Sequence, residues 1–229
     1  MNESLKYAVD IVMCIDATMS MKRTLDRVKD SALSFHTRLA AAMEEKGRSI
    51  SQLRLKVIGF RDFGDRADDA IEQTDFLTFP DGAVEFERFV RDLTARGGGD
   101  IPESGLEALA LAVQAPWEQG LDRRRHVIVL FTDAPAHPLG SPSQVSVRTY
   151  PQSVPHSMEE LFSQWGHAQS SDALMENSAK RLLLFAPEDQ PWEDIADQWN
   201  HTLFFPSEAG EGLEEWEMDE IINTIANSL

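Results

Sequence analysis

The sequence predicts an α/β fold, a doubly wound and mostly parallel central sheet of about six strands with helices on both faces. Apolar runs of strand length alternate with stretches of helical periodicity along the 229 residues. Two of the runs, Tyr7–Ile15 and His126–Phe131, are almost uninterrupted, which is typical of strands buried on both faces. The length fits a single domain, residues 1–229, with a loop-rich insertion at about 136–157.

The elements follow from periodicity and from their stop signals. Residues Pro80–Gly82 end a short run that we expect to be an antiparallel edge strand. The predicted strands are Tyr7–Ile15, Leu53–Phe60, Asp75–Phe79, His126–Phe131, Lys180–Ala186 and Thr202–Phe205. The predicted helices are Ser20–Lys46, Val84–Ala95, Ser104–Gln114, Met158–His167, Trp192–Trp199 and Glu214–Leu229.

Composition excludes several function classes. Lys plus Arg is 21 and Asp plus Glu is 39, so the net charge is −18, and nucleic acid or an anionic membrane is not expected as a partner. The one cysteine, Cys14, cannot form a disulfide within the chain. We expect a cytoplasmic protein, because no basic segment precedes an apolar run at the start and no run approaches the ~20 residues of a membrane helix.

Hard oxygen donors follow two of the apolar strands. The pattern Asp16-x-Thr18-x-Ser20 ends the first strand, and Asp133 follows the strand His126–Phe131. The carboxyl ends of parallel strands meet at one edge of a sheet, where ligands bind. Carboxylates and hydroxyls suit Mg²⁺, Mn²⁺ or Ca²⁺. We expect Thr18 and Ser20 to coordinate such an ion directly, and the two aspartates to bind it directly or through water.

Each motif also has a purely structural interpretation. Asp, Thr and Ser before a helix are preferred N-caps, so Asp16, Thr18 and Ser20 fit that role too. Asp100-x-x-Glu103 is typical of a capping box, and Asp133 before Ala-Pro is typical of a turn. The metal interpretation gains weight because three separate loops bring acids to the same predicted edge.

These motifs resemble those of the von Willebrand factor type A (vWA) family and its metal-ion-dependent adhesion site (MIDAS). The loop Asp16–Ser20 matches the family pattern Asp-x-Ser/Thr-x-Ser, although Met19 stands where many members have glycine. Thr132-Asp133 matches the Thr-Asp element after the fourth strand of the family. Gly97–Glu103 resembles a Gly-Gly-Gly-Asp-x-Pro-Glu loop found in one subgroup, which looks bacterial, intracellular and stand-alone. The resemblance spans roughly Tyr7–Leu229 and implies a Rossmann-like vWA fold.

The resemblance also implies roles for acids in the other loops. By likeness to integrin β-chain domains, Glu103 is the candidate ligand from the third loop, and Thr94, at a helix end, is a secondary candidate. Asp100 would lie beside the ion or bind an accessory ion. Asp62 is a further candidate neighbour, although a structural salt bridge involving Arg61 is the favoured role for that turn.

The function implied is a non-enzymatic module in which a bound cation recruits an Asp or Glu of a protein partner. Analogy to the subgroup suggests a bacterial signalling or stress-response system, with movement of the last helix, Glu214–Leu229. One alternative is a Mg²⁺-dependent phosphohydrolase of haloacid dehalogenase type. That class needs an acid where Thr18 stands and a late lysine at the site, whereas Lys180 begins a strand. The other alternative is a vWA scaffold that works without metal.

Overall fold

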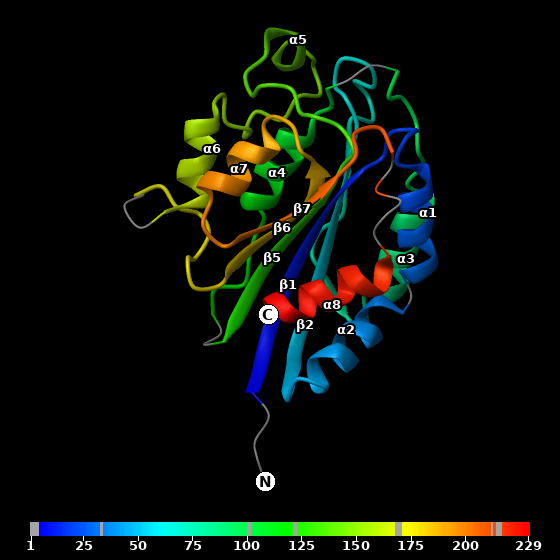
Figure 1. The fold of residues 1–229 in the computed structure, drawn as a ribbon, viewed down its shortest axis with the longest axis vertical. Coiled ribbons are helices and arrows are strands. Elements are labelled where there is room, and N and C mark those ends of the chain that lie inside the picture. Colours follow the sequence, from blue (N-terminus) through cyan, green and yellow to red (C-terminus); the bar gives the residue numbers. More distant parts are fainter. Residues whose placement is uncertain are drawn as a thin grey trace.

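The strands form one sheet whose parallel core runs through the centre of the molecule (Figure 1). The structure, a computed structural model, describes residues 5–32, 34–99, 102–120, 123–167, 171–211, 213 and 217–229. Its strands are β1 (Leu5–Asp16), β2 (Arg48–Phe60), β3 (Ile71–Gln73), β4 (Leu77–Phe79), β5 (Arg124–Phe131), β6 (Lys180–Pro187) and β7 (Thr202–Ser207).

The strand order is β3-β2-β1-β5-β6-β7, with β4 also paired to β2. Strands β2, β1, β5, β6 and β7 are parallel, and the short β3 and β4 run antiparallel to β2. This arrangement confirms the predicted doubly wound, mostly parallel sheet and the antiparallel edge strand around Leu77–Phe79. Strand β3 was not predicted, because three residues are too few to show alternation.

Helices cover both faces of the sheet, as predicted (Figure 1). On one face lie α1 (Lys22–Ser31), α2 (Phe35–Glu44), α3 (Ala83–Asp92) and α8 (Met218–Ser228). On the other lie α4 (Gly105–Val113), α6 (Met158–Trp165) and α7 (Trp192–Gln198). The short α5 (Pro142–Val145) falls within the segment predicted to be loop-rich. None of the helices in the described part of the chain has the length and apolar character that crossing a membrane requires.

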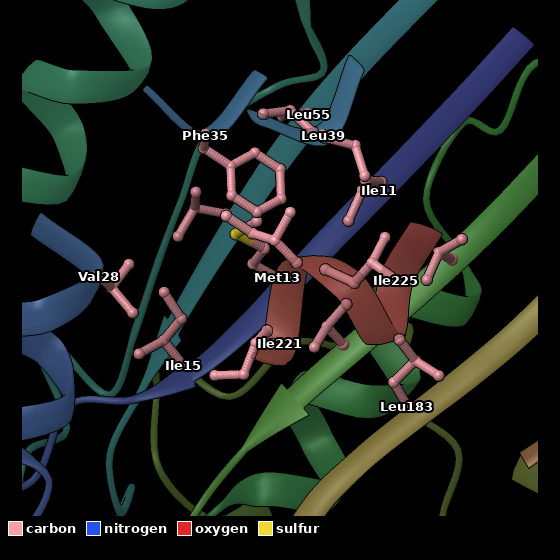
Figure 2. Close-up of a cluster of buried hydrophobic side chains, with 14 of the residues drawn as sticks. Ile11, Met13, Ile15, Val28, Phe35, Leu39, Leu55, Leu183, Ile221 and Ile225 are labelled. Atoms are coloured by element: carbon pink, nitrogen blue, oxygen red, sulfur yellow. The ribbon is translucent and has the colours of Figure 1, made fainter. Parts of the chain in front are cut away.

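The central strand β1 supplies side chains to both layers. Ile11, Met13 and Ile15 join the core under α1, α2 and α8, where Figure 2 shows them among side chains from those helices. Val12 and Cys14 point to the opposite core under α4. This alternation explains why the sequence of β1 is apolar at nearly every position, since both of its faces are buried.

The predicted single helix Ser20–Lys46 is wrong, because the structure has two helices there, α1 and α2. A turn separates them, in which the Ser34 backbone N–H donates to the Ser31 carbonyl at 3.1 Å. The Ser34 hydroxyl donates to the same carbonyl at 3.2 Å, so the side chain competes with continued helix. Helix α2 has Glu45 as its C-cap, and Gly47, two residues further on, has a positive φ of 69°.

Parallel pairing places the ends of β1 and β5 side by side. Ile15 is the partner of Phe131 in the register of these two strands. Asp16 and Thr132 come next along each chain, so the loops that carry Asp16 and Asp133 leave the sheet at the same edge. The fold thereby brings together two of the predicted ligand loops.

Candidate metal centre

Asp16 is the buried anchor of the site at the end of β1. Its side chain is fully buried, and one carboxylate oxygen, Oδ1, accepts hydrogen bonds from the Thr18 backbone N–H at 2.9 Å and from the Thr18 hydroxyl at 2.6 Å. The other oxygen, Oδ2, accepts from the Thr132 hydroxyl at 2.7 Å. Asp16 thus shapes the loop and ties it to the end of β5.

A continuous polar chain leads from Asp16 to the second loop. The Thr18 and Ser20 hydroxyl oxygens lie 3.3 Å apart, and the Ser20 hydroxyl donates to Asp133 Oδ1 at 3.0 Å. Asp133 and Thr18 are each 1 % exposed, whereas Ser20 is exposed. Four of the predicted ligand residues therefore form one cluster that is buried on one side and open to solvent at Ser20.

The N-cap alternative does not describe this loop. Helix α1 begins at Lys22, and its N-cap is Met21, whose side chain makes no capping hydrogen bond. The Asp16 carboxylate binds the Thr18 N–H instead, a local turn within the loop itself. The capping-box alternative fails at Glu103 for a similar reason, since α4 begins at Gly105 and its N-cap is Ser104.

The pKa of the Asp16 carboxyl is raised to about 6, chiefly by burial and to a small extent by the charge of Asp133, against hydrogen bonds from Thr18 and Thr132 that lower it. Two buried carboxylates in one cluster disfavour the doubly ionised state. A divalent cation between them would remove that cost, because it would compensate both charges.

The glycine-rich loop packs directly against the Asp16 loop. Gly97 and Gly98 have φ values of +72° and +82°, and the Met19 N–H donates to the Gly97 carbonyl at 3.3 Å. A Cβ on Gly98 would stand 2.9 Å from the Thr18 Cβ. Glycine is required here for both backbone conformation and close approach. Met19, where many vWA members have glycine, directs its side chain outward and is 54 % exposed.

Backbone hydrogen bonds hold Glu103 at the same edge of the sheet. Its N–H donates to the Pro135 carbonyl at 3.0 Å, and its carbonyl accepts from the His137 N–H at 2.9 Å. The pairing continues as an isolated parallel bridge between Glu103 and Ala136. The side chain is 2 % exposed. Glu103 therefore lies beside the loop that carries Asp133, as its predicted role requires.

The secondary candidates are placed differently. Asp62 belongs to a separate buried cluster, in which its Oδ1 accepts from Gln144 Nε2 at 2.6 Å and lies 3.2 Å from His137 Nε2. The Thr94 carbonyl accepts a hydrogen bond from Arg61 at 2.6 Å. Asp100 lies outside the described residues.

Arg61 makes the structural ion pair predicted for that turn. It is fully buried and pairs with Glu72 at 2.8 Å rather than with its neighbour Asp62. Its guanidinium also donates to the Asp69 carbonyl at 2.6 Å. Arg61 thus binds the segments after β2 to each other.

Two contacts of the site were not anticipated from sequence. Thr132 binds Asp16, and the Trp192 indole Nε1–H of α7 donates to the Ala134 carbonyl at 2.8 Å. The position of Thr132 beside Asp133 at a strand end was a usable signal. No sequence signal indicated the contact of Trp192, because it lies 58 residues along the chain from Ala134.

The donor set suits a hard cation. Among the described residues, no group of three or more His, Cys, Asp or Glu side chains is arranged to hold a metal. The cluster instead combines two carboxylates with the hydroxyls of Thr18 and Ser20. Oxygen donors of this kind, with few charges, fit Mg²⁺, which commonly keeps several water ligands.

Comparison with known proteins places the fold. No family model matches the chain. The alpha-protein kinase vwkA of Dictyostelium discoideum is 27 % identical over 151 residues, which are 66 % of this chain and 22 % of that protein. This chain therefore spans about a fifth of the length of the curated relative that it matches.

Two solved structures of the pilus adhesin SpaC from Lactobacillus rhamnosus GG match 96 % of this chain and 30 % of theirs. Their TM-scores are 0.53 and 0.54, at 11 % and 13 % identity. The vWF domain of the pilus tip protein Mfa5 from Porphyromonas gingivalis covers 58 % of this chain at 21 % identity, with a TM-score of 0.36. The sheet and the likeness to the SpaC structures define the class of fold, a doubly wound and mostly parallel α/β domain, which is the architecture that the vWA resemblance implies.

Proposed function

We propose that the chain is a protein-interaction domain that binds a divalent cation, Mg²⁺ or alternatively Mn²⁺ or Ca²⁺, at the loops after β1 and β5. The direct ligands would be Asp16, Thr18, Ser20 and Asp133. Glu103, from the loop before α4, would reach the ion through water, since the described residues hold no group of three acids arranged around a metal. The observation that carries the proposal is the continuous chain of contacts from Asp16 through Thr18 and Ser20 to Asp133.

The cation would supply an electrophilic position that a partner carboxylate can occupy. Exposure supports this arrangement, since Asp16, Thr18 and Asp133 are buried while Ser20 and Met19 are exposed. An incoming Asp or Glu side chain would approach from the Ser20 side. The loops around it, including residues 136–157, would determine which partner fits. By analogy with the vWA subgroup, the partner belongs to a signalling or stress-response system in bacteria.

Capture of partners from source cells tests the proposal. We expect the wild-type chain to retain a partner with Mg²⁺ present and to release it with a chelator. Ser20→Ala should fail to retain it, and because Ser20 is exposed this variant should fold normally. Ser171→Ala, which removes another exposed serine, is the matched control. Recovery of the same partner from wild type and Ser20→Ala in the presence of chelator would support the metal-independent scaffold instead.

The phosphohydrolase alternative is less well supported by the geometry. The residue two positions after Asp16 is Thr18, which donates to Asp16 and has no carboxyl to act as general acid. Lys180 is fully buried at the amino end of β6, where its Nζ donates to the Trp165 carbonyl at 2.8 Å. We expect no turnover of p-nitrophenyl phosphate with Mg²⁺. Turnover that Asp16→Asn abolishes would overturn the interaction proposal.

A further inference from the structure

A small groove, lined by apolar and polar side chains, lies between α6 and α7, the two helices that sit side by side over one face of the sheet (Figure 1). Its volume is about 210 Å³. Met158 and Phe162 line it from α6, and Pro191 and Trp199 line it from the ends of α7. Cavities that hold drug-sized ligands measure roughly 300–1,000 Å³, so this groove suits one or two side chains.

Aromatic stacking supports the floor of the groove. The Phe162 ring stacks on Trp199 with centroids 5.8 Å apart, and Trp199 stacks on Trp165 at 5.4 Å. The indole N–H of Trp165 donates to the Asn200 side chain at 3.1 Å. Trp199 is 5 % exposed, whereas Phe162 and Met158 are only half-buried. The groove is thus preformed, and part of its apolar wall contacts solvent.

Both walls of the groove carry negative charge. Glu159 on α6 and Asp194 on α7 line the groove and are exposed. The sequence has no Lys or Arg in residues 149–179 or 182–229, the stretches that contain the two helices. Further exposed acids flank these positions: Glu160, Glu193 and Asp197. An apolar floor between acidic walls complements an apolar side chain flanked by cations.

We propose that this groove binds a short basic segment of a partner protein. One aromatic or aliphatic side chain of the segment sits against Met158, Phe162 and Trp199. Lys or Arg residues on either side of that anchor face Glu159 and Asp194. Binding of this kind needs no cation at Asp16, so the groove is a second contact surface, separate from the proposed carboxylate-recruiting site.

A labelled peptide tests the groove directly. The probe is a fluorescein-labelled hexapeptide of sequence KRLWKR, followed by fluorescence anisotropy in the presence of EDTA. We expect saturable binding to the wild-type chain, weaker at high salt. The peptide KRGSKR, with the same charge and no anchor, should bind at least about tenfold more weakly. Because EDTA is present, failure of the metal proposal leaves this result unchanged.

Charge reversal locates the binding. The double variant Glu159→Lys, Asp194→Lys should weaken KRLWKR binding about tenfold or more. Glu44→Lys with Asp81→Lys makes the same change in net charge at exposed positions outside the groove and should leave binding nearly unchanged. Three outcomes would overturn the proposal: no saturable binding up to about 1 mM, equal binding of the two peptides, or equal weakening by the two double variants.

Discussion

The Ser20 hydroxyl donates a hydrogen bond to the Asp133 carboxylate at 3.0 Å, although the two residues are 113 positions apart in the sequence. This contact joins the loop after β1 to the loop after β5, which are neighbouring parallel strands. The site is therefore built from two loops, and a substitution in either loop should alter the conformation of the other.

Gly98→Ala should destabilise the protein and weaken cation binding. The substitution places a Cβ 2.9 Å from the Thr18 Cβ at a residue with φ of +82°. We expect a loss of about 1–3 kcal/mol in the free energy of unfolding. Gly99→Ala is the matched control, since a Cβ there meets nothing within 4 Å and its φ is not positive. Equal effects of the two variants in urea unfolding would contradict this role for the glycine loop.

Asp133→Asn should stabilise the metal-free protein by less than about 1 kcal/mol, because it removes the Asp133 charge, which is the smallest of the effects on the pKa of Asp16. In saturating Mg²⁺ the wild type should instead be more stable than Asp133→Asn. The wild type gains about 2.7 kcal/mol at a hundredfold excess over Kd, and the variant gains little. Thermal melts with and without Mg²⁺ measure both effects. A variant that melts below the wild type in EDTA would refute the repulsion argument.

Glu107 should make stability depend on pH. This α4 residue is fully buried, and its Oε2 has no hydrogen-bond partner among the described residues. Its pKa is raised from 4.5 to about 7, chiefly by burial and to a small extent by the charge of Asp62, against the hydrogen bond that the Tyr150 hydroxyl donates to Oε1 at 3.2 Å. Between these two pKa values the folded state holds a proton that the unfolded state has lost. The contribution of Glu107 to the free energy of unfolding therefore falls as pH rises from 4.5 to 7, by about 3 kcal/mol in all.

Glu107→Gln should remove this dependence, because the amide is neutral throughout the range. Urea unfolding of both proteins at several pH values between 4.5 and 7.5 measures the difference. We expect the variant to gain stability relative to the wild type as pH rises. A constant difference between the two proteins across the range would show that Glu107 titrates normally.

Gln144→Ala should loosen the segment 136–157. The Gln144 side chain is buried, donates to Asp62 Oδ1 at 2.6 Å and accepts from the Ser104 hydroxyl at 2.9 Å. Loss of both contacts should cost about 1–3 kcal/mol. It should also speed proteolysis within the segment. Gln152→Ala removes an exposed glutamine of the same segment and should change neither quantity; similar proteolysis of both variants would contradict the anchoring role.

Much of the fold was predictable because burial leaves a strong pattern. The alternation of Val9, Ile11 and Met13 with Val12 and Cys14 identifies a strand buried on both faces. The break between α1 and α2 could not be predicted from hydrophobic periodicity. The spacing of the buried apolar residues continues through the turn as it would in one long helix: Met21, Leu25, Val28, Ala32, Phe35, Leu39 and Ala42.

The part of the site that lies directly after the strand ends could be predicted from the sequence. Asp16, Thr18, Ser20 and Asp133 converge because β1 and β5 are neighbours in the sheet. Asp62 could not be placed from sequence, since its partners Gln144 and His137 come from a segment without periodicity. The contact of Trp192 with Ala134 depends on tertiary packing of α7, which no local pattern encodes.

Titration calorimetry of Mg²⁺ into the wild-type chain and into Ser20→Ala tests the central claim most directly. The wild type should bind one ion with measurable heat, and Ser20→Ala should bind it at least about tenfold more weakly. Ser171→Ala, which changes an exposed serine outside the site, should match the wild type. The absence of binding heat for both Mg²⁺ and Mn²⁺ in the wild type, or equal affinities of wild type and Ser20→Ala, would contradict a cation site at these loops.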